Sequence, residues 1–150
     1  MEQSKIRDAV LALSLIFVLS FLFNYIWESL HEAFLYEPCK LEVSEYIQMI
    51  LYVSLIDASI ILGIYLGTAV LWKDILWVQK MDGMQVLVIC IAGMVIAAII
   101  EYRGALVLRK WSYGPGMPTI FGIGLSPLLQ LSTTGLLTFW VVRRMLYRRC

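Results

Sequence analysis

The sequence predicts an all-α membrane protein whose helices cross a lipid bilayer several times. Composition carries part of this prediction: 61% of the 150 residues are hydrophobic and only 15% are charged, and the mean hydropathy is +0.81. A soluble domain has about 25% charged residues. The apolar residues also form long runs, and a bilayer-spanning helix needs about 20 of them in sequence. We therefore expect residues 1–150 to fold as one transmembrane helical bundle domain.

Four runs have the length of a membrane-spanning helix, and they cover residues 9–28, 46–71, 85–108 and 118–142. None of them alternates apolar and polar residues as a barrel strand does, and a lone segment in lipid satisfies its backbone hydrogen bonds only as a helix. The expected architecture is a bundle of four transmembrane helices.

The segment WKDILWVQKMDG, which connects the second and third spans, is too polar to cross the membrane. It places Trp72 and Trp77 among charged residues. Because tryptophan prefers the level of the lipid head groups, we expect this segment to lie in the membrane interface.

The lysines and arginines predict the orientation of the bundle. Eight of the 12 lie on the side that holds both termini, namely Lys5, Arg7, Lys73, Lys80, Arg143, Arg144, Arg148 and Arg149. The others are Lys40, Arg103, Arg109 and Lys110. Since positively charged loops remain in the cytoplasm, we expect both termini to be cytoplasmic. These residues flank apolar segments and form no basic stripe, so nucleic acid is not an expected partner.

Five polar side chains fall inside the spans. A rise of about 1.5 Å per residue places Asn24, Glu28 and Glu101 in the outer half of the bilayer, and Asp57 and Gln130 near its middle. An ionisable group at this depth is costly, which makes it a candidate functional residue. For the two glutamates we favour a function. For Asp57 and Gln130, a structural role in holding the helices together is an equally good interpretation.

The surroundings of these residues predict how the helices pack. The helical period puts five residues on one face of the first span, which must point inward: Asn24, Glu28, His31, Glu32 and Leu35. Four small residues surround Glu101 and let another helix approach: Ala97, Ala98, Gly104 and Ala105. Three residues interrupt the fourth span before Gln130: Gly122, Gly124 and Pro127. Such a break is tolerated in a membrane where protein or a cavity covers it.

A weak internal repeat supports the grouping. The same number of residues separates Glu28 from Asp57 and Glu101 from Gln130, and Ser59 and Ser132 follow at matching positions. This spacing predicts two pseudo-symmetric hairpins related by an axis along the membrane normal.

Metal and thiol chemistry find little support. His31 is the single histidine, so neither HExxH nor a pair of Glu-x-x-His motifs is present. Cys39, Cys90 and Cys150 are widely spaced, with no CxxC. We expect no metal and no cofactor, and we expect His31 to orient Glu28 through a hydrogen bond.

Proton chemistry remains as the best candidate. A carboxyl group kept away from water retains its proton, so Glu28 or Glu101 can serve as a general acid. Aromatic rings stabilise cations, and protonation of an isoprenoid alkene or epoxide creates a carbocation. Most rings on the outer side fit an interfacial belt, but Trp27 and Trp111 flank the two carboxyl groups.

The stretch NYIWESLHEAFLY resembles the Asn-x-x-Trp-Glu signature of membrane-bound terpene cyclases from fungal meroterpenoid pathways. This resemblance implies that Glu28 is a catalytic proton donor, with Asn24 and Trp27 as matching positions. The chain is shorter than those seven-span enzymes, so a complete pocket of that kind implies a homodimer.

The stretch EYRGALVLRKWSYGPGMPTIFGIGLSPLLQL resembles the small polytopic lycopene cyclase domains, more weakly. Glu101, Trp111 and Tyr113 match the acid-x-Trp-x-aromatic part of that pattern, whereas Gln130 stands near the place of a paired Glu. The whole chain is also similar to small prokaryotic membrane proteins, of uncharacterised activity, that share NxxWExxH and WxYxxxMP. This similarity implies a location in the prokaryotic cytoplasmic membrane.

Taken together, these patterns favour an isoprenoid cyclase or isomerase of the isomerase or lyase class, with a lipid-soluble isoprenoid as substrate and membrane lipids as surroundings. Glu28 is the expected acid, Glu101 the base or second acid. The expected substrate-binding residues are Asn24, Trp27, His31, Asp57, Trp111, Tyr113 and Gln130. Two alternatives remain open at this point: a proton-coupled transporter or channel subunit, and an accessory or scaffold subunit of a membrane complex.

Overall fold

The computed structural model describes residues 2–36 and 42–147 of the chain. Its long helices are α1 (Glu2–Phe34), α2 (Val43–Trp72), α3 (Gly83–Glu101) and α4 (Leu125–Tyr147), and a π-helix, η2 (Tyr102–Val107), continues α3. With η2 added to α3, all four are long and apolar enough to cross a membrane. The prediction of an all-α, four-helix, multi-pass membrane protein is confirmed.

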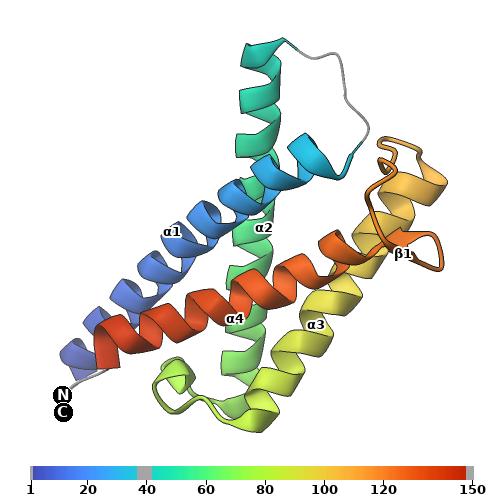
Figure 1. Cartoon of the computed structure of the whole chain (residues 1–150). Helices are drawn as coiled ribbons and strands as arrows, with labels where there is room; N and C mark the ends of the chain where they lie inside the picture. Colours follow the sequence, from blue (N-terminus) through green and yellow to red (C-terminus); the bar gives the residue numbers. More distant parts are fainter. Residues whose placement is uncertain (1, 37–41, 148–150) are drawn as a thin grey trace.

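The helices pair as two hairpins that lie against each other. α1 packs on α2, α3 packs on α4, and α1 also runs antiparallel along α4, as Figure 1 shows. Between α2 and α3 the contact is slighter. Both termini lie at one end of the bundle, and we call the opposite end the distal end (Figure 1).

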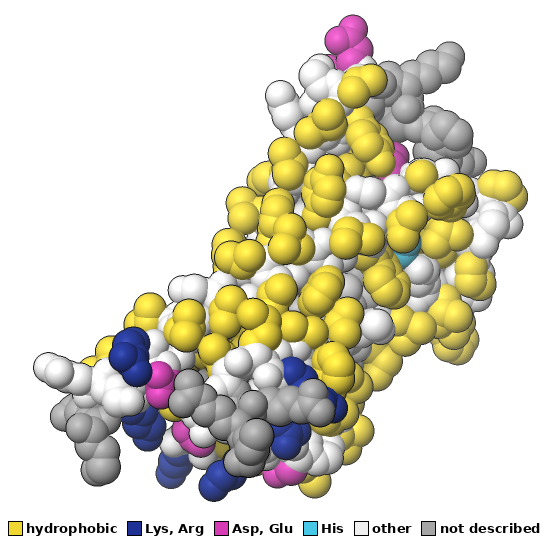
Figure 2. Space-filling model, turned by 60° about the vertical axis from the view of Figure 1, so that its left-hand side comes forward, with side chains coloured by type: hydrophobic (Ala, Val, Ile, Leu, Met, Phe, Trp, Pro, Cys, Tyr) yellow, Lys and Arg dark blue, Asp and Glu magenta, His cyan; other side chains and the backbone are white. Residues whose placement is uncertain are grey.

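The surface has the distribution expected of a protein in a bilayer. Apolar side chains cover the middle of the molecule in Figure 2, and lysine and arginine gather at the end that holds the termini. The described basic residues at this end are all exposed: Lys5, Arg7, Lys73, Lys80, Arg143 and Arg144. Lys40, Arg148 and Arg149 lie outside the described residues.

Polar residues fix the ends of the helices. Glu42 and Glu45 form a capping box at the start of α2, and Asp82 and Gln85 form another at the start of α3. These side chains bond to backbone N–H groups that have no partner within the helix. α2 ends where Lys73 adopts a left-handed conformation with φ of 55°, so the chain turns back toward α3.

Trp77, in the loop that we expect at the membrane interface, packs inside the protein. It belongs to the short 3₁₀-helix η1 (Trp77–Lys80) and is only 2% exposed. Its indole N–H donates to the Tyr65 carbonyl oxygen at 3.1 Å, and its ring centroid is 5.5 Å from that of Phe139. Tyr65 and Phe139 offer this ring a buried site that the composition of the loop does not reveal. Trp72 is half-buried.

The predicted start of the fourth span is also wrong. Residues 118–124 carry a small antiparallel hairpin, β1 (Thr119–Ile120) and β2 (Ile123–Gly124). Phe121 and Gly122 form its turn with φ of 52° and 79°, the two positive values that a tight two-residue hairpin requires. Gly122 and Gly124 therefore precede the helix instead of breaking it. Pro127 lies in the first turn of α4, where its missing N–H leaves no bond unmade.

α3 and α4 lie close together at Gly93. A Cβ atom at this position would lie 2.6 Å from Ser132 Oγ and 2.8 Å from Ser132 N. The Ser132 hydroxyl donates to the Cys90 carbonyl oxygen across the same contact at 2.9 Å. Glycine thus permits an interhelical hydrogen bond that a larger residue would separate.

We expect Gly93→Ala to lower the free energy of unfolding by about 1–3 kcal/mol, because backbone atoms of α4 must move. Gly63→Ala is the matched control, since a Cβ there meets nothing within 4 Å. Thermal unfolding in detergent should show a lower midpoint for Gly93→Ala alone. Equal midpoints for the two variants would contradict this packing.

Candidate functional site

The centre of the site is the side-chain amide of Gln130. Its Nε2 lies 2.5 Å from Glu28 Oε1, 2.9 Å from Asp57 Oδ2 and 3.2 Å from Asn24 Oδ1. These residues come from α1, α2 and α4, so one amide group joins three helices. Asn24, Asp57 and Gln130 are buried, and Glu28 is half-buried. The sequence placed these side chains at similar depth, and the structure brings them into direct contact.

A seam of polar side chains between α1 and α4 positions this amide. The Thr134 hydroxyl donates to Asn24 Oδ1 at 3.2 Å, and Asn24 Nδ2 donates to the Ser20 carbonyl oxygen at 2.8 Å. One turn further toward the termini, Ser20 donates to the Thr138 hydroxyl at 3.3 Å. Both partners of every interhelical bond in this seam are buried, so the register between the helices that carry Glu28 and Gln130 is fixed.

Glu101 is held by a second set of donors. The Trp111 indole N–H and the Tyr113 hydroxyl both donate to its Oε2, at 3.2 Å and 2.5 Å. Glu101 ends α3, whereas Trp111 and Tyr113 lie in the loop after η2. Nine residues separate Glu101 from Trp111 in the sequence, and the loop brings both aromatic side chains directly onto the acid.

Gly104 makes room for an aromatic ring, not for a neighbouring helix as predicted. A Cβ at this position would lie 1.9 Å from Trp111 Cη2, so an indole ring takes the space that we assigned to a neighbouring helix. Ala98 and Ala105 are half-buried. The π-helix turns Gly104 toward the ring, a distortion that helical periodicity does not anticipate.

We expect Gly104→Ala to displace the Trp111 ring and break its bond to Glu101. The chain has 5 tryptophans, so their indole N–H signals can be followed by NMR in detergent, with Trp111→Phe to assign the relevant one. That signal should move upfield in Gly104→Ala, as the N–H loses its charged acceptor. Gly116→Ala, where the nearest atom is 3.7 Å away, should leave all signals in place. An unchanged Trp111 signal in Gly104→Ala would refute the contact.

Two tyrosines close the site at the distal end. Tyr36 follows α1 and pairs with Tyr113 in an isolated antiparallel bridge, with ring centroids 5.8 Å apart. Burial, then the nearby Glu101 charge, raises the pKa of the Tyr36 phenol above its ordinary value. Burial and the hydrogen bond to Glu101 raise the pKa of Tyr113 to about 12. Both phenols therefore stay protonated at neutral pH and can donate hydrogen bonds.

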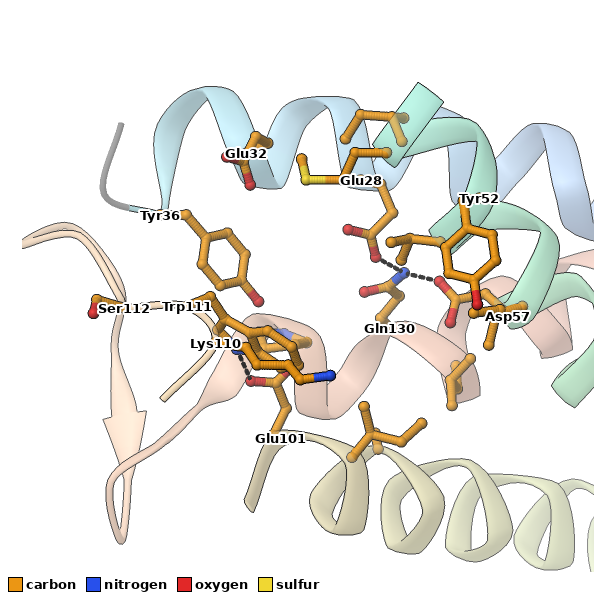
Figure 3. A pocket seen from close by; sticks show the side chains of 18 of the residues that line it. Glu28, Glu32, Tyr36, Tyr52, Asp57, Glu101, Lys110, Trp111, Ser112 and Gln130 are labelled. Atoms are coloured by element: carbon orange, nitrogen blue, oxygen red, sulfur yellow. Dashed lines mark hydrogen bonds between the residues drawn. The ribbon is translucent and has the colours of Figure 1, made fainter. Parts of the chain in front are cut away.

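The carboxyl groups of Glu28 and Glu101 lie on opposite sides of a cavity of about 680 Å³. This size lies within the range of about 300–1,000 Å³ typical of small-molecule sites. We call Asn24, Glu28, Asp57 and Gln130 the Gln130 cluster. In Figure 3 the labelled members of this cluster lie on one side of the cavity, Glu101 with Trp111 on the other, and Tyr36 near them at the distal end. Apolar side chains make up much of the remaining wall: Met49, Ile50, Val53, Ile56, Ala97, Ile100, Pro127 and Leu131.

Part of the cavity wall consists of side chains exposed on the apolar surface of α2 and α3. Tyr52 and Ile56 of α2 and Ile100 of α3 line it, and these side chains are 66%, 39% and 38% exposed. Since the surface at this depth faces lipid, a lipid-soluble molecule can enter from the bilayer. Glu32, Arg109, Lys110 and Ser112 line the distal part.

The predicted role of His31 is wrong. Its Nε2 lies 2.5 Å from the Ser126 hydroxyl oxygen, so it joins α1 to the start of α4 and does not orient Glu28. The buried His31 and the cavity are separate, since His31 is not among the lining residues. Trp27 lies edge-on to His31 at 5.4 Å and also does not line the cavity. Trp27 directly precedes Glu28, so its side chain lies on a different face of α1. His31 shares the face of Glu28, but its ring bonds to Ser126 at the α1–α4 contact.

Other site residues escaped the sequence reasoning. In the sequence, Tyr36 and Tyr52 fit an interfacial aromatic belt, and Arg109 and Lys110 fit the charge bias between the two sides of the membrane. The sequence feature that could have indicated these four residues is the high density of aromatic and basic residues at the distal side of the spans. Arg103 lies two residues after Glu101 but is exposed and makes no ion pair with it; in residues 2–36 and 42–147 the ion pair found is Arg7–Asp8.

The internal repeat does not extend to the contacts. Gln130 bonds to Glu28 and Asp57, whereas the matching acid Glu101 bonds to the loop. Ser59 is exposed and donates to its own helix at Leu55, while Ser132 is buried in the α3–α4 contact. The two helical hairpins are similar in their arrangement, but the polar residues at matching positions make different contacts.

Within the described residues, no group of three or more His, Cys, Asp or Glu side chains is arranged to hold a metal ion. We assign no metal to the cavity. Cys90 is a free, half-buried thiol, and Cys39 and Cys150 lie outside the described residues.

Fold and site define a small multi-pass membrane protein with an acid-lined cavity between its helices. Comparison of the chain with protein-family models, with curated proteins and with solved structures finds no match. The function must therefore be inferred from the cavity itself.

Proposed function

We propose that this protein is a membrane-embedded enzyme that protonates a lipid-soluble isoprenoid and guides the resulting carbocation to a cyclic or rearranged isomer. The observation that carries the proposal is the arrangement of two separately held carboxyl groups on opposite sides of a substrate-sized cavity. An acid and a base in this arrangement can add a proton at one end of a bound chain and remove one at another.

The Gln130 cluster is suited to be the acid. An amide nitrogen carries two hydrogens, yet three oxygen atoms lie within bonding distance of it. A proton held between Glu28 and Asp57 supplies the missing donor and avoids two adjacent negative charges. Glu28 is the member that is half-exposed toward the cavity, so it delivers this proton.

The opposite wall is suited to receive a proton and to stabilise positive charge. Glu101 accepts two hydrogen bonds, which hold its carboxyl group at the cavity wall, and we assign it the role of base. Tyr36, Tyr52 and Trp111 supply ring faces along the cavity for a passing cation.

The reaction is balanced without a co-reactant. The Glu28 proton forms a new C–H bond as the alkene π bond breaks, and a second alkene closes a C–C bond onto the cation. Loss of a neighbouring C–H proton to Glu101 then forms the product alkene. The product is an isomer of the substrate, and the two carboxyl groups exchange one proton through solvent before the next cycle.

The test is conversion of linear isoprenoid hydrocarbons, alcohols, epoxides and phosphate esters of increasing chain length by protein purified in detergent, with the phosphate esters dephosphorylated before analysis. Gas chromatography with mass spectrometry should detect a new isomer of unchanged mass for at least one substrate, and heat-denatured protein should give none. If no member of the panel is isomerised, the proposal fails.

A further inference from the structure

The distal part of the cavity carries two adjacent cationic side chains, Arg109 and Lys110. Both follow η2, and both line the cavity. Arg109 has a left-handed backbone with φ of 49°, and the Lys110 N–H donates to the Gly104 carbonyl oxygen at 2.9 Å. This turn directs the pair toward the site. Figure 3 shows the Lys110 side chain extending into the cavity near Glu101.

These cations are not used to neutralise the acids of the cavity. Four carboxyl groups line it, those of Glu28, Glu32, Asp57 and Glu101, yet neither cation forms an ion pair in the described part of the chain. Glu28 and Asp57 accept from Gln130, and Glu101 accepts from Trp111 and Tyr113. Glu28, Asp57 and Glu101 thus have donors of their own, whereas Arg109 and Lys110 share the distal part of the cavity with Glu32 and form no ion pair with it among the described residues.

A molecule with an anionic head and an apolar chain fits a cavity that has apolar walls and two cations at its distal end. Its chain can enter between α2 and α3, where Tyr52, Ile56 and Ile100 are exposed to lipid. Its head then remains at the distal end, the level at which Arg109 and Lys110 are exposed. Arginine binds phosphate oxygens with two parallel N–H groups, and lysine adds a point charge.

We infer that Arg109 and Lys110 bind the phosphate head group of the substrate, which is an isoprenoid phosphate ester with its chain in the cavity. This inference rests on the proposed function for the identity of the chain, but it concerns binding and needs no turnover. It also distinguishes a chain-linked phosphate from free phosphate and from the head group of a membrane phospholipid.

The experiment measures binding of radiolabelled farnesyl phosphate to the full chain in phosphatidylcholine nanodiscs. Unlabelled farnesyl phosphate should compete about ten-fold better than farnesol, the advantage expected of a charge-assisted hydrogen bond. Inorganic phosphate and phosphatidic acid added to the nanodiscs should compete weakly. The double variant Arg109→Gln/Lys110→Gln should lose the advantage while its farnesol affinity, which reports an intact cavity, stays unchanged.

Arg103→Gln is the matched control, because Arg103 is exposed at the same end and does not line the cavity. It should retain the full advantage of farnesyl phosphate. The inference is overturned if the double variant keeps that advantage, if wild type shows none, or if inorganic phosphate or phosphatidic acid competes equally well. Failure of the catalytic proposal is a separate result: isomer formation would be absent while the binding difference persists.

Discussion

Replacing Glu28 with glutamine should lower isomer formation by about 10²–10⁴-fold, the usual contribution of a general acid. Glutamine has nearly the same shape and can still hydrogen-bond within the cluster, but it has no acidic proton to transfer. The new amide can donate to Asp57, because Asp57 and Glu28 accept hydrogen bonds from the same Gln130 nitrogen. The fold should therefore survive, and the thermal midpoint should remain close to that of the wild type.

Glu32→Gln is the matched control for this variant. Glu32 lies one turn further along α1 and lines the same cavity, but it is not a partner of Gln130. Its replacement should change turnover by less than about three-fold, since it removes a charge without removing the acid. Should Glu28→Gln retain most of the wild-type rate, or should both variants lose activity equally, Glu28 is not the proton donor.

Replacing Gln130 with leucine should lower the free energy of unfolding by about 2–4 kcal/mol, because the change leaves buried acceptors without a donor. Asp57 and Asn24 are 8% and 0% exposed, so water replaces the lost amide poorly. Leucine fills a similar volume, and the cost is therefore one of hydrogen bonding. Turnover should fall as well, since Glu28 loses the group that holds it.

A second substitution separates this explanation from a packing effect. Adding Asp57→Asn to Gln130→Leu removes one acceptor and restores a donor beside Glu28, so the double variant should be more stable than Gln130→Leu alone. Leu129→Ala, on a side chain that is 41% exposed, should leave the unfolding midpoint nearly unchanged. A Gln130→Leu protein as stable as the wild type would mean that the cluster does not hold the helices.

The sequence predicted the spans well because their signal is local. Runs of apolar residues and the side of each charged residue suffice to find four helices and the shared end of the termini. The late start of the fourth helix has a local cause as well. Residues 118–124 are apolar enough to extend a span, but the turn at Phe121 and Gly122 pairs them as a hairpin. The burial of Trp77 beside Tyr65 is a tertiary contact that the composition of the loop does not reveal.

The site was predicted in outline and missed in detail. Depth along each span indicated that Asn24, Glu28, Asp57 and Gln130 lie at similar levels, but the single amide that joins them depends on the rotation of three helices. His31 was expected at Glu28 because both share a face of α1; it bonds instead to Ser126, across the α1–α4 contact. Partners that lie far apart in sequence leave no periodic signal.

The central claim is that a carboxyl proton from the Gln130 cluster becomes bonded to carbon of the substrate. Isomer formation in deuterium oxide tests it most directly, after the protein has exchanged its acidic protons with solvent. The account predicts one deuterium at a non-exchangeable carbon of each product molecule, and little or no labelled product from Glu28→Gln. Product formed in deuterium oxide without any deuterium on carbon would contradict it.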